Sequence, residues 1–481
     1  MIYDYIIVGG GPCGMTMAHV ISRYRKNAKI LLLDREKSLG GCHRVRRVES
    51  NLFTEHGPRI YLDNYKKFKQ LIKEADIDFD QFMVPYNFQF LNISDNILKK
   101  LGVRELFAFA LAYSKHFLNL REWSHKLSVQ DWMDKYKFNP EIQDYIDRAC
   151  RLTDGAGADR YTVFEFLELM NQNSLYQVRE PNIPNDLGMM GKWEKFLQAR
   201  PNIHIKTGAH VDKIKLNQLH QIQVNGYQTY QGEHLLLAIP PKHLVQLLDQ
   251  SKIYDAFGSW KKLTKWEKDS RYLVYIPIFY HWIRKTVGLH KVWGLPEKSE
   301  WGLVFIVMSD YMTFPKSSTK DMISIAITKP NAISENIGKS ANQCDKDEIL
   351  LEVYRQMLEI FPEIKNNPPD KQIISPGVFR NDMGEWETKD TAFMLTPKGG
   401  FGPRESSHYP NFYSVGCHNG NSNYNFTALE SAVQNGLSMC HQLIPESKKG
   451  YKTSGIFTIQ KLLYLIITFG IIMFLMNKYY L

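Results

Sequence analysis

The alternation of apolar and polar residues divides the first part of the chain into a strand, a turn, a helix and a second strand. Tyr5–Val8 is a short apolar run, and a glycine-rich segment follows it. Met15 to about Arg25 has helical spacing, and Ile30–Leu33 is a second run of β-favouring residues. Because parallel strands need a crossover connection of this kind, the pattern predicts a βαβ unit and an α/β fold.

Beyond this unit, a long helical stretch is followed by separated strand patterns. From about Tyr65 to Leu197, aromatic residues and leucines recur at helical spacing. Strand patterns stand at His204–Lys206, Val211–Leu216, His234–Ile239, Tyr272–Tyr280, Gly302–Met308, Met322–Thr328 and Asn411–Val415, and the last precedes a helix from about Thr427 to Leu443. We expect the strands between residues 272 and 328 to form a mostly antiparallel sheet.

The C-terminal segment is the most apolar part of the chain. No charged residue interrupts Leu462–Met476, and a helix that begins at Ile456 has about 21 residues, close to the roughly 20 that cross a hydrocarbon core. Lys461 and Lys478 flank the run, where their side chains can reach the two interfaces. The sequence therefore predicts a transmembrane helix over residues 456–476. A buried core helix and a helix lying in the interface are the alternatives.

Composition and charge narrow the class of protein. With 481 residues, 44% of them hydrophobic, the chain is long enough for more than one core. Its six cysteines are widely spaced, which indicates a reducing compartment. No signal peptide pattern is present at the N-terminus, so we expect the catalytic part to face the cytosol.

The net charge of +10 is spread along the chain, so we expect no nucleic-acid partner. Lys448, Lys449 and Lys452 precede the apolar segment and favour contact with anionic membrane lipid. The histidines and cysteines show no metal-ligand spacing, and no metal is expected.

The glycine-rich turn predicts a dinucleotide site. Gly9, Gly11 and Gly14 have the spacing at which the first glycine permits a tight turn, the second lets the backbone approach a pyrophosphate, and the third allows helix and strand to pack closely. Asp34 follows Gly14 by 20 positions, at the end of the second strand, where it can accept hydrogen bonds from a ribose.

The segment after Asp34 resembles the signature of the FAD-dependent amine oxidase superfamily, which includes phytoene desaturases and protoporphyrinogen oxidases. In that family an acidic residue is followed by a Gly-Gly pair, here Gly40-Gly41, that passes beneath the phosphates. The arginine that usually comes next is Cys42, and Arg44 is the nearest candidate for its role. Residues 55–59, Glu-His-Gly-Pro-Arg, are similar to a stretch near the flavin, especially in the protoporphyrinogen oxidase variant.

Later segments match the same family in the same order. Residues 208–214 resemble a strand whose valine, here Val211, contacts adenine, and residues 238–241 resemble the strand end Ala-x-Pro-Pro. Gly416 and residues 430–436 resemble the closing motif at the pyrophosphate and flavin, with Ser431 in place of a usual glycine.

The resemblance implies a Rossmann-like FAD-binding domain (GR2-type) with a mixed α+β substrate domain. We expect residues 1–90, 200–250 and 385–445 to form the FAD-binding domain, 91–199 a helical cap, 251–384 an antiparallel-sheet substrate region, and 446–455 a basic linker before the transmembrane helix. The residues expected to hold the cofactor are Gly9, Gly11, Pro12, Cys13, Gly14, Asp34, Arg35, Gly40, Gly41, Cys42, Arg44, Gly57, Pro58, Arg59, Val211, Gly416 and Ala428.

The implied reaction is hydride removal from a small molecule by noncovalent FAD, with oxygen or a quinone among the conceivable electron acceptors. Catalytic residues are not identified by the sequence. His56, Arg59 and Phe401 are weak candidates for the flavin face, and Arg59 or Arg44 could stabilise the reduced flavin anion. Ala428 stands where amine oxidases with an aromatic cage carry a tyrosine, which argues against a monoamine oxidase. The membrane segment and the aromatic-rich helical region suggest a lipophilic substrate.

Two other classes remain open. One is a flavin enzyme without net redox change, similar to UDP-galactopyranose mutase. The other is a non-catalytic membrane scaffold that keeps a nucleotide-binding fold.

Overall fold

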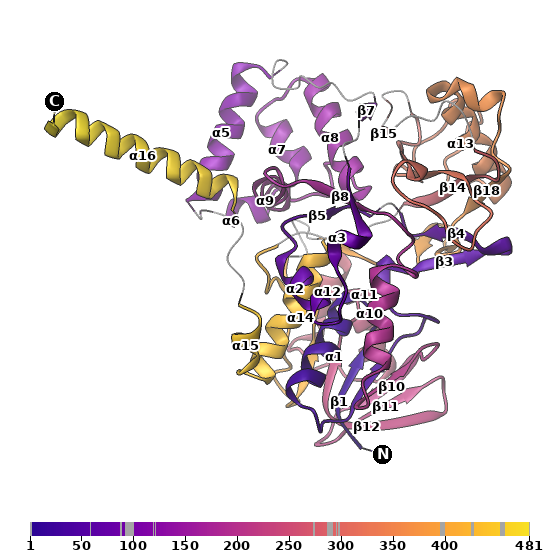
Figure 1. The fold of residues 1–481 in the computed structure, drawn as a ribbon, viewed down its shortest axis with the longest axis vertical. Coiled ribbons are helices and arrows are strands. Elements are labelled where there is room, and N and C mark those ends of the chain that lie inside the picture. Colours follow the sequence, from indigo (N-terminus) through magenta and orange to yellow (C-terminus); the bar gives the residue numbers. More distant parts are fainter. Residues whose placement is uncertain are drawn as a thin grey trace.

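The computed structural model describes residues 2–57, 59–86, 89–91, 101–118, 120, 122–272, 275–285, 292–294, 296, 299–394, 400–424, 428–452 and 457–480. Two sheets with their helices dominate the body, and the C-terminal helix projects from it (Figure 1).

A seven-stranded sheet organises the lower part of the molecule in Figure 1. Its strands are β1 (Ile2–Val8), β2 (Ile30–Leu33), β9 (Ile203–Lys206), β10 (Val211–Lys215), β11 (His220–Val224), β12 (Gln228–Leu237) and β22 (Phe412–Ser414). The order is β10-β11-β12-β1-β2-β9, and β22 also pairs with β12. β1 is parallel to β2 and β12, while β10, β11 and β12 form an antiparallel meander. The predicted βαβ unit is confirmed.

Helices cover both faces of this sheet, which explains why its central strands are apolar throughout. The helices of this part are α1 (Pro12–Tyr24), α2 (Lys66–Lys73), α3 (Phe79–Phe82), α10 (Met189–Gln198), α11 (Pro241–Gln250), α12 (Trp260–Asp269), α14 (Leu429–Leu443) and α15 (Ser447–Gly450). Side chains alternate along β1. Tyr5 and Ile7 join the core under α1 and α14, whereas Ile6 and Val8 join the core under α11.

A six-stranded sheet is the second main sheet of the molecule. It contains β7 (Gln89–Leu91), β14 (Ile276–Trp282), β15 (Val292–Gly294), β16 (Leu303–Val307), β17 (Asp321–Ile327) and β18 (Lys371–Ile374). Its pairings are antiparallel except for β7 with β15, so the expected antiparallel sheet is confirmed. Helix α13 (Lys346–Ile360) packs its apolar side chains into the core of this sheet.

The remaining elements lie between and beside the two sheets. They are the helices α5 (Val103–Phe117), α6 (Glu122–His125), α7 (Val129–Lys135), α8 (Pro140–Asp154) and α9 (Val163–Asn173), and the strands β3 (Val45–Val48), β4 (Leu52–Glu55), β5 (Tyr61–Leu62), β6 (Met83–Pro85), β8 (Val178–Pro181), β13 (Arg271–Tyr272), β19 (Val378–Arg380), β20 (Trp386–Thr388) and β21 (Phe393–Met394).

The predicted helical stretch from about residue 65 to 197 is helical for most of its length, but the strands β6, β7 and β8 interrupt it, which the prediction missed. These strands have three or four residues each, too few to show a period of two in an aromatic-rich sequence.

Helix α16 (Ile459–Tyr480) ends the described chain and projects away from the body (Figure 1). Within the described residues, no helix combines the length and the apolar content that crossing a bilayer requires. The expected transmembrane helix over residues 456–476 is therefore not supported by the structure, and residue 456 lies outside the described chain.

Candidate functional site

The three glycines between β1 and α1 have different surroundings. A Cβ at Gly9 would lie 2.3 Å from the carbonyl oxygen of Ala238, and one at Gly14 would lie 1.9 Å from the carbonyl oxygen of Gly9. A Cβ at Gly11 would meet only the Cα of Gly41, at 3.7 Å. Gly9 and Gly14 are thus required by packing, whereas Gly11 borders open space.

Two helix N-termini face this open space. Gly11 precedes α1 and gives it no side-chain cap, Pro12 has no N–H, and the N–H of Met15 donates to Gly11, so the free donors belong to Cys13 and Gly14. Ala428 likewise precedes α14 without a side-chain cap. Unpaired N–H groups and the positive ends of both helix dipoles favour an anionic group here.

The Gly40-Gly41 pair forms the floor beneath α1. The N–H of Gly40 donates to the carbonyl oxygen of Gly10 over 2.8 Å, which ties the two glycine-rich segments together. Gly40 and Gly41 have φ angles of +111° and +55°, which favour glycine. A Cβ at Gly41 would lie 3.0 Å from the Cα of Gly11, so both segments approach closely.

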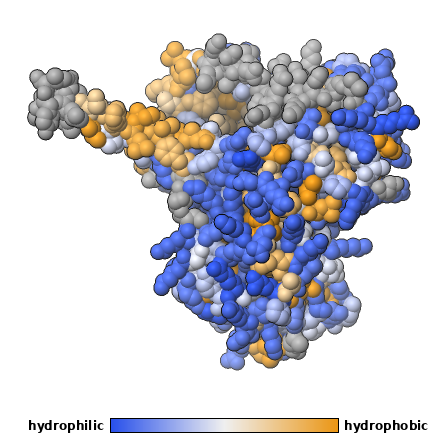
Figure 2. Space-filling model, in the orientation of Figure 1, coloured by the Kyte–Doolittle hydropathy of each residue, from blue (hydrophilic) through white to orange (hydrophobic). Residues whose placement is uncertain are grey.

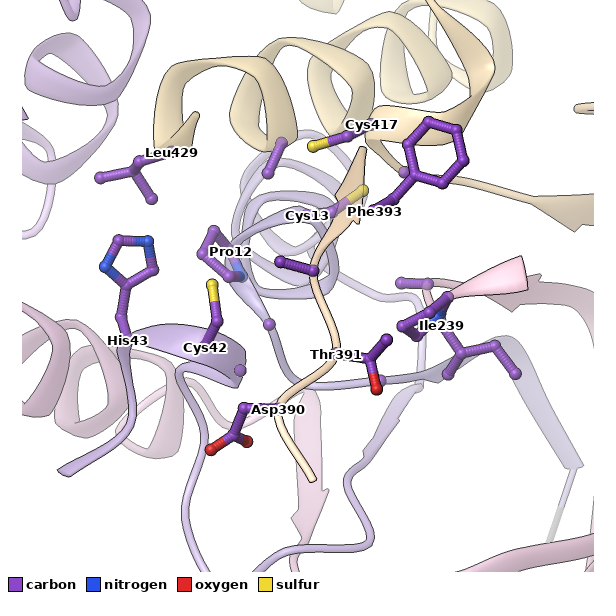
Figure 3. Close-up of a pocket in the computed structure, with 18 of the residues that line it drawn as sticks. Pro12, Cys13, Cys42, His43, Ile239, Asp390, Thr391, Phe393, Cys417 and Leu429 are labelled. Carbon is purple, nitrogen blue, oxygen red and sulfur yellow. The ribbon is translucent and has the colours of Figure 1, made fainter. Parts of the chain in front are cut away.

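These elements border one cavity of about 790 Å³, part of which is drawn in Figure 3. Pro12 and Cys13 reach it from α1, Cys42 from below, and Leu429 from α14. Of the residues expected to hold a cofactor, those on the wall are Gly9, Gly11, Pro12, Cys13, Asp34, Arg35, Gly41, Cys42, Arg44, Arg59, Val211, Gly416 and Ala428.

Several other predicted residues stand away from this wall. Gly57 packs against Tyr275, whose hydroxyl oxygen would be 2.6 Å from an added Cβ, and the ring of His56 lies 4.7 Å from the same tyrosine ring. Phe401 packs on Gly420 and is 39% exposed. The structure therefore does not bring His56 or Phe401 to the cavity. Pro58 lies outside the described residues.

Asp34 lies at the cavity, but its carboxylate already has partners. One oxygen accepts the N–H of Gly10 at 2.9 Å, and the other accepts the N–H of Glu36 at 2.8 Å and lies 3.2 Å from Arg44. Arg44 also forms an ion pair with Asp390. Burial raises the pKa of Asp34, although Arg44 and the two N–H groups oppose the shift.

Asp390 is a site residue that the sequence did not indicate. Its second oxygen binds Arg46 at 2.8 Å, and Arg46 in turn binds Glu36 at 2.8 Å. Asp390 follows Asp34 by more than 350 positions, so only the fold brings them together. Both arginines that follow Cys42 in this segment, Arg44 and Arg46, therefore bind Asp390.

Arg44 and Arg59 differ as candidate cations for a flavin. Arg44 is neutralised by the carboxylates of Asp34 and Asp390. The guanidinium of Arg59 donates to the carbonyl oxygen of Cys42, and its Nε is buried without a hydrogen-bond partner among the described residues. Arg59 thus retains its charge and a free donor at the cavity, which fits an anionic or oxygen-rich ligand.

A buried carboxyl group lies next to Arg59. Glu55 ends β4 and is 2% exposed. Burial raises the pKa of Glu55 to about 8, against the opposing effect of Arg59. Burial also raises the pKa of Glu180 on β8, and Glu55 adds to that shift. Near neutral pH Glu55 therefore retains its proton and leaves Arg59 without a compensating anion.

Replacing Glu55 by glutamine is expected to make stability less dependent on pH. Above the unfolded-state pKa of about 4.5, the unfolded chain loses a proton that the folded chain keeps up to about pH 8. This group therefore lowers the free energy of unfolding as pH rises through that window, by up to about 1.4 kcal/mol per pH unit. Urea unfolding at several pH values between about 4.5 and 8 measures how steeply the free energy of unfolding changes with pH.

The exposed Glu122→Gln is the matched control and should keep the wild-type slope. An E55Q protein with the wild-type slope would show that Glu55 is ionised in the folded chain.

Two further parts of the wall were not predicted. Helix α11 contributes His243 and Leu247 beside Val211, and burial lowers the pKa of His243 to about 4, so its ring is neutral. The second part consists of Met170 on α9 and of Tyr176, which follows that helix. A proline at the first position of α11, Pro241, is a helix-start signal that could have indicated the first of these.

Comparisons with known proteins agree with this geometry. A family profile described as an NAD(P)-binding Rossmann-like domain matches residues 7–75, which contain the glycine turn and Asp34. No curated protein sequence matches the chain.

Solved structures resemble nearly the whole chain. Putrescine oxidase with bound putrescine has 10% sequence identity and a TM-score of 0.67, over 92% of this chain and 99% of that one. Cyclohexylamine oxidase from Brevibacterium oxydans IH-35A has 12% identity and a TM-score of 0.63, over 93% of this chain and 100% of that one. A putative protoporphyrinogen oxidase from Exiguobacterium sp. 255-15 has 15% identity and a TM-score of 0.59, over 92% and 99%. The chain therefore contains a Rossmann-like segment at residues 7–75 and shares its overall fold with these solved structures.

Proposed function

We propose that this protein is an FAD-dependent oxidoreductase that removes hydride from a small molecule. The observation that carries the proposal is the cavity bordered by the Gly11 turn, by Gly41 and by the start of α14. FAD, when bound, supplies the hydride acceptor and passes the electrons on, to oxygen or a quinone. The chain's own residues bind the cofactor, orient the substrate and exclude water from the site.

Each part of the cavity suits a different part of FAD. The free N–H groups after Gly11 and Ala428 suit the pyrophosphate. Asp34, whose carboxylate also pairs with Arg44, suits the ribose hydroxyls. Val211 and Leu247, with the polar side chains His243, Gln246 and Gln250 of α11, suit adenine, and the cation of Arg59 suits the flavin's pyrimidine end. We propose that this binding is noncovalent.

The other end of the cavity supports a lipophilic substrate. The side chains there are mostly apolar and come from segments around β5, α8 and α9: Leu62, Leu152, Leu169, Met170 and Val178. Tyr176 also lines this end, and its hydroxyl accepts the N–H of Phe457 at 2.8 Å, just before α16. An apolar molecule leaving a bilayer beside α16 would meet this end of the cavity first.

Membrane attachment through α16 is part of the proposal. Leu465, Ile467 and Phe469 are each more than half exposed, and α16 forms an apolar projection in Figure 2. A run of exposed apolar side chains like this one is unfavourable in water and indicates a contact with lipid or protein. We place α16 as a single C-terminal anchor, with the catalytic part on the cytosolic side.

Anaerobic mixing with candidate substrates tests the proposed reaction. Lipophilic compounds with an oxidisable C–N or C–C bond should bleach the flavin absorption of the purified protein, and air should restore it. A soluble amine that reacts equally well after deletion of α16 would contradict a lipophilic substrate. A reaction that needs reduced flavin but consumes no acceptor would favour the mutase-like class, and a protein that carries no flavin would favour the scaffold.

A further inference from the structure

Large apolar side chains are exposed at both ends of helix α5, where Arg104 and Ser114 are exposed as well. Val103 is 86% exposed, Phe107 63% and Leu118, just after the helix, 66%. The opposite face is buried in the helical core through Ala108 and Ala112. A surface helix of a water-soluble domain normally has polar residues on its outer face. Large apolar side chains exposed on this helix therefore indicate a contact with an apolar partner.

This face is continuous with the start of α16. The carbonyl oxygen of Phe117, the last residue of α5, accepts the side-chain N–H of Gln460 at 2.8 Å and the hydroxyl of Tyr464 at 2.7 Å. The backbone N–H of Gln460 donates to the side chain of Asn171 on α9 at 2.9 Å. The first turn of α16 is thus fixed against α5 and α9, and apolar surface covers both the α5 region and α16 in Figure 2.

Charges around α5 favour an anionic partner. Residues 101–137 contain six Lys or Arg and four Asp or Glu, a net charge of +2. One of the four acids, Glu105, is buried and accepts the N–H of Asn139. Lys126 is exposed and pairs with the exposed Glu122, while Lys115 lies over the ring of Trp123 at 5.4 Å. An apolar face with basic surroundings is the pattern of a helix that lies in the surface of an anionic bilayer.

We propose that the outer face of α5 is a second membrane-contact surface, which inserts Val103, Phe107 and Leu118 into the interfacial layer of an anionic bilayer. The inference rests on the proposed attachment through α16. Two contacts, one at each helix, fix the orientation of the body on the membrane more tightly than α16 alone. The apolar end of the cavity then stays close to the lipid.

A polarity-sensitive fluorophore on the full-length protein tests this surface. Phe107→Cys carries the label, and Leu351→Cys on α13 is the matched control, since Leu351 is 71% exposed and lies on the part of the molecule far from α16 (Figure 1). The wild-type chain, labelled in the same way, corrects for its own cysteines. Vesicles contain phosphatidylcholine with about 30 mol % phosphatidylserine.

On vesicles, the label at position 107 should shift to shorter wavelength and be quenched by a lipid-phase quencher at least several-fold more than the label at 351. Adding Val103→Asp should reduce that quenching. If the protein sediments with vesicles but the label at 107 behaves as the label at 351, the proposed membrane contact of α5 is wrong. Attachment through α16 then stands. If the protein does not sediment with vesicles, both are wrong. If the label at 107 shifts to shorter wavelength without lipid, and more so at higher protein concentration, a second copy of the chain covers this face. That result would overturn the proposal.

Discussion

Gly11→Val is expected to abolish FAD binding without unfolding the protein. Gly11 has a φ of −72°, which any residue adopts, and a Cβ there makes only an ordinary contact with Gly41. The valine side chain would instead occupy the cavity in front of the first free N–H groups of α1, where the pyrophosphate is placed. We expect affinity for FAD to fall by about a hundredfold or more, equivalent to about 3 kcal/mol. Flavin content after purification and titration calorimetry measure the loss.

Gly14→Val is the contrasting variant in the same turn. A Cβ at Gly14 would lie 1.9 Å from the carbonyl oxygen of Gly9, so this substitution disturbs the packing of α1 on β1. It should lower the unfolding temperature, whereas Gly11→Val should leave the unfolding temperature of the flavin-free protein nearly unchanged. A Gly11→Val protein that retains full flavin content would show that the pyrophosphate does not lie at this turn.

Arg44→Met is expected to be the most destabilising substitution of a charged residue at the site. Arg44 lies between Asp34 and Asp390, and the side chains of all three are less than 10% exposed. Removing the cation leaves two buried carboxylates close together, and breaking a buried ion pair from one side costs about 3–5 kcal/mol. Urea unfolding of the flavin-free protein measures this loss separately from any loss of cofactor.

Two variants make this measurement specific. Lys126→Met removes the cation of an exposed pair with Glu122 and should leave stability unchanged. Arg44→Met combined with Asp390→Asn should recover part of the loss, because Asp34 still accepts two backbone N–H groups. An Arg44→Met protein as stable as the Lys126→Met control would mean that Arg44 does not neutralise these acids.

The local part of the nucleotide site could be predicted from sequence because its residues are close along the chain. The Gly9–Gly14 turn, the β2 strand and Asp34 lie within 26 positions of one another, and turn chemistry and strand periodicity specify them. The role of Gly40-Gly41 beneath the phosphates could be predicted only from the family resemblance, because a Gly-Gly pair alone does not indicate which segment it approaches.

The rest of the site depends on contacts between distant segments. Asp390, His243 and Tyr176 reach the cavity from three other regions of the chain, and apart from Pro241 at the start of α11 no local pattern indicates them. His56 and Phe401 were chosen for their chemistry, but packing against Tyr275 and Gly420 directs their rings elsewhere. The short strands β6 and β8 were missed because pairing partners, rather than their own few residues, make them strands.

The absorption spectrum of the purified protein, recorded before and after acid precipitation, tests the central claim most directly. We predict a flavin spectrum that moves entirely to the supernatant on precipitation, and that returns when FAD is added to the refolded flavin-free chain. A protein that is colourless as purified, and stays colourless with excess FAD, would contradict the account.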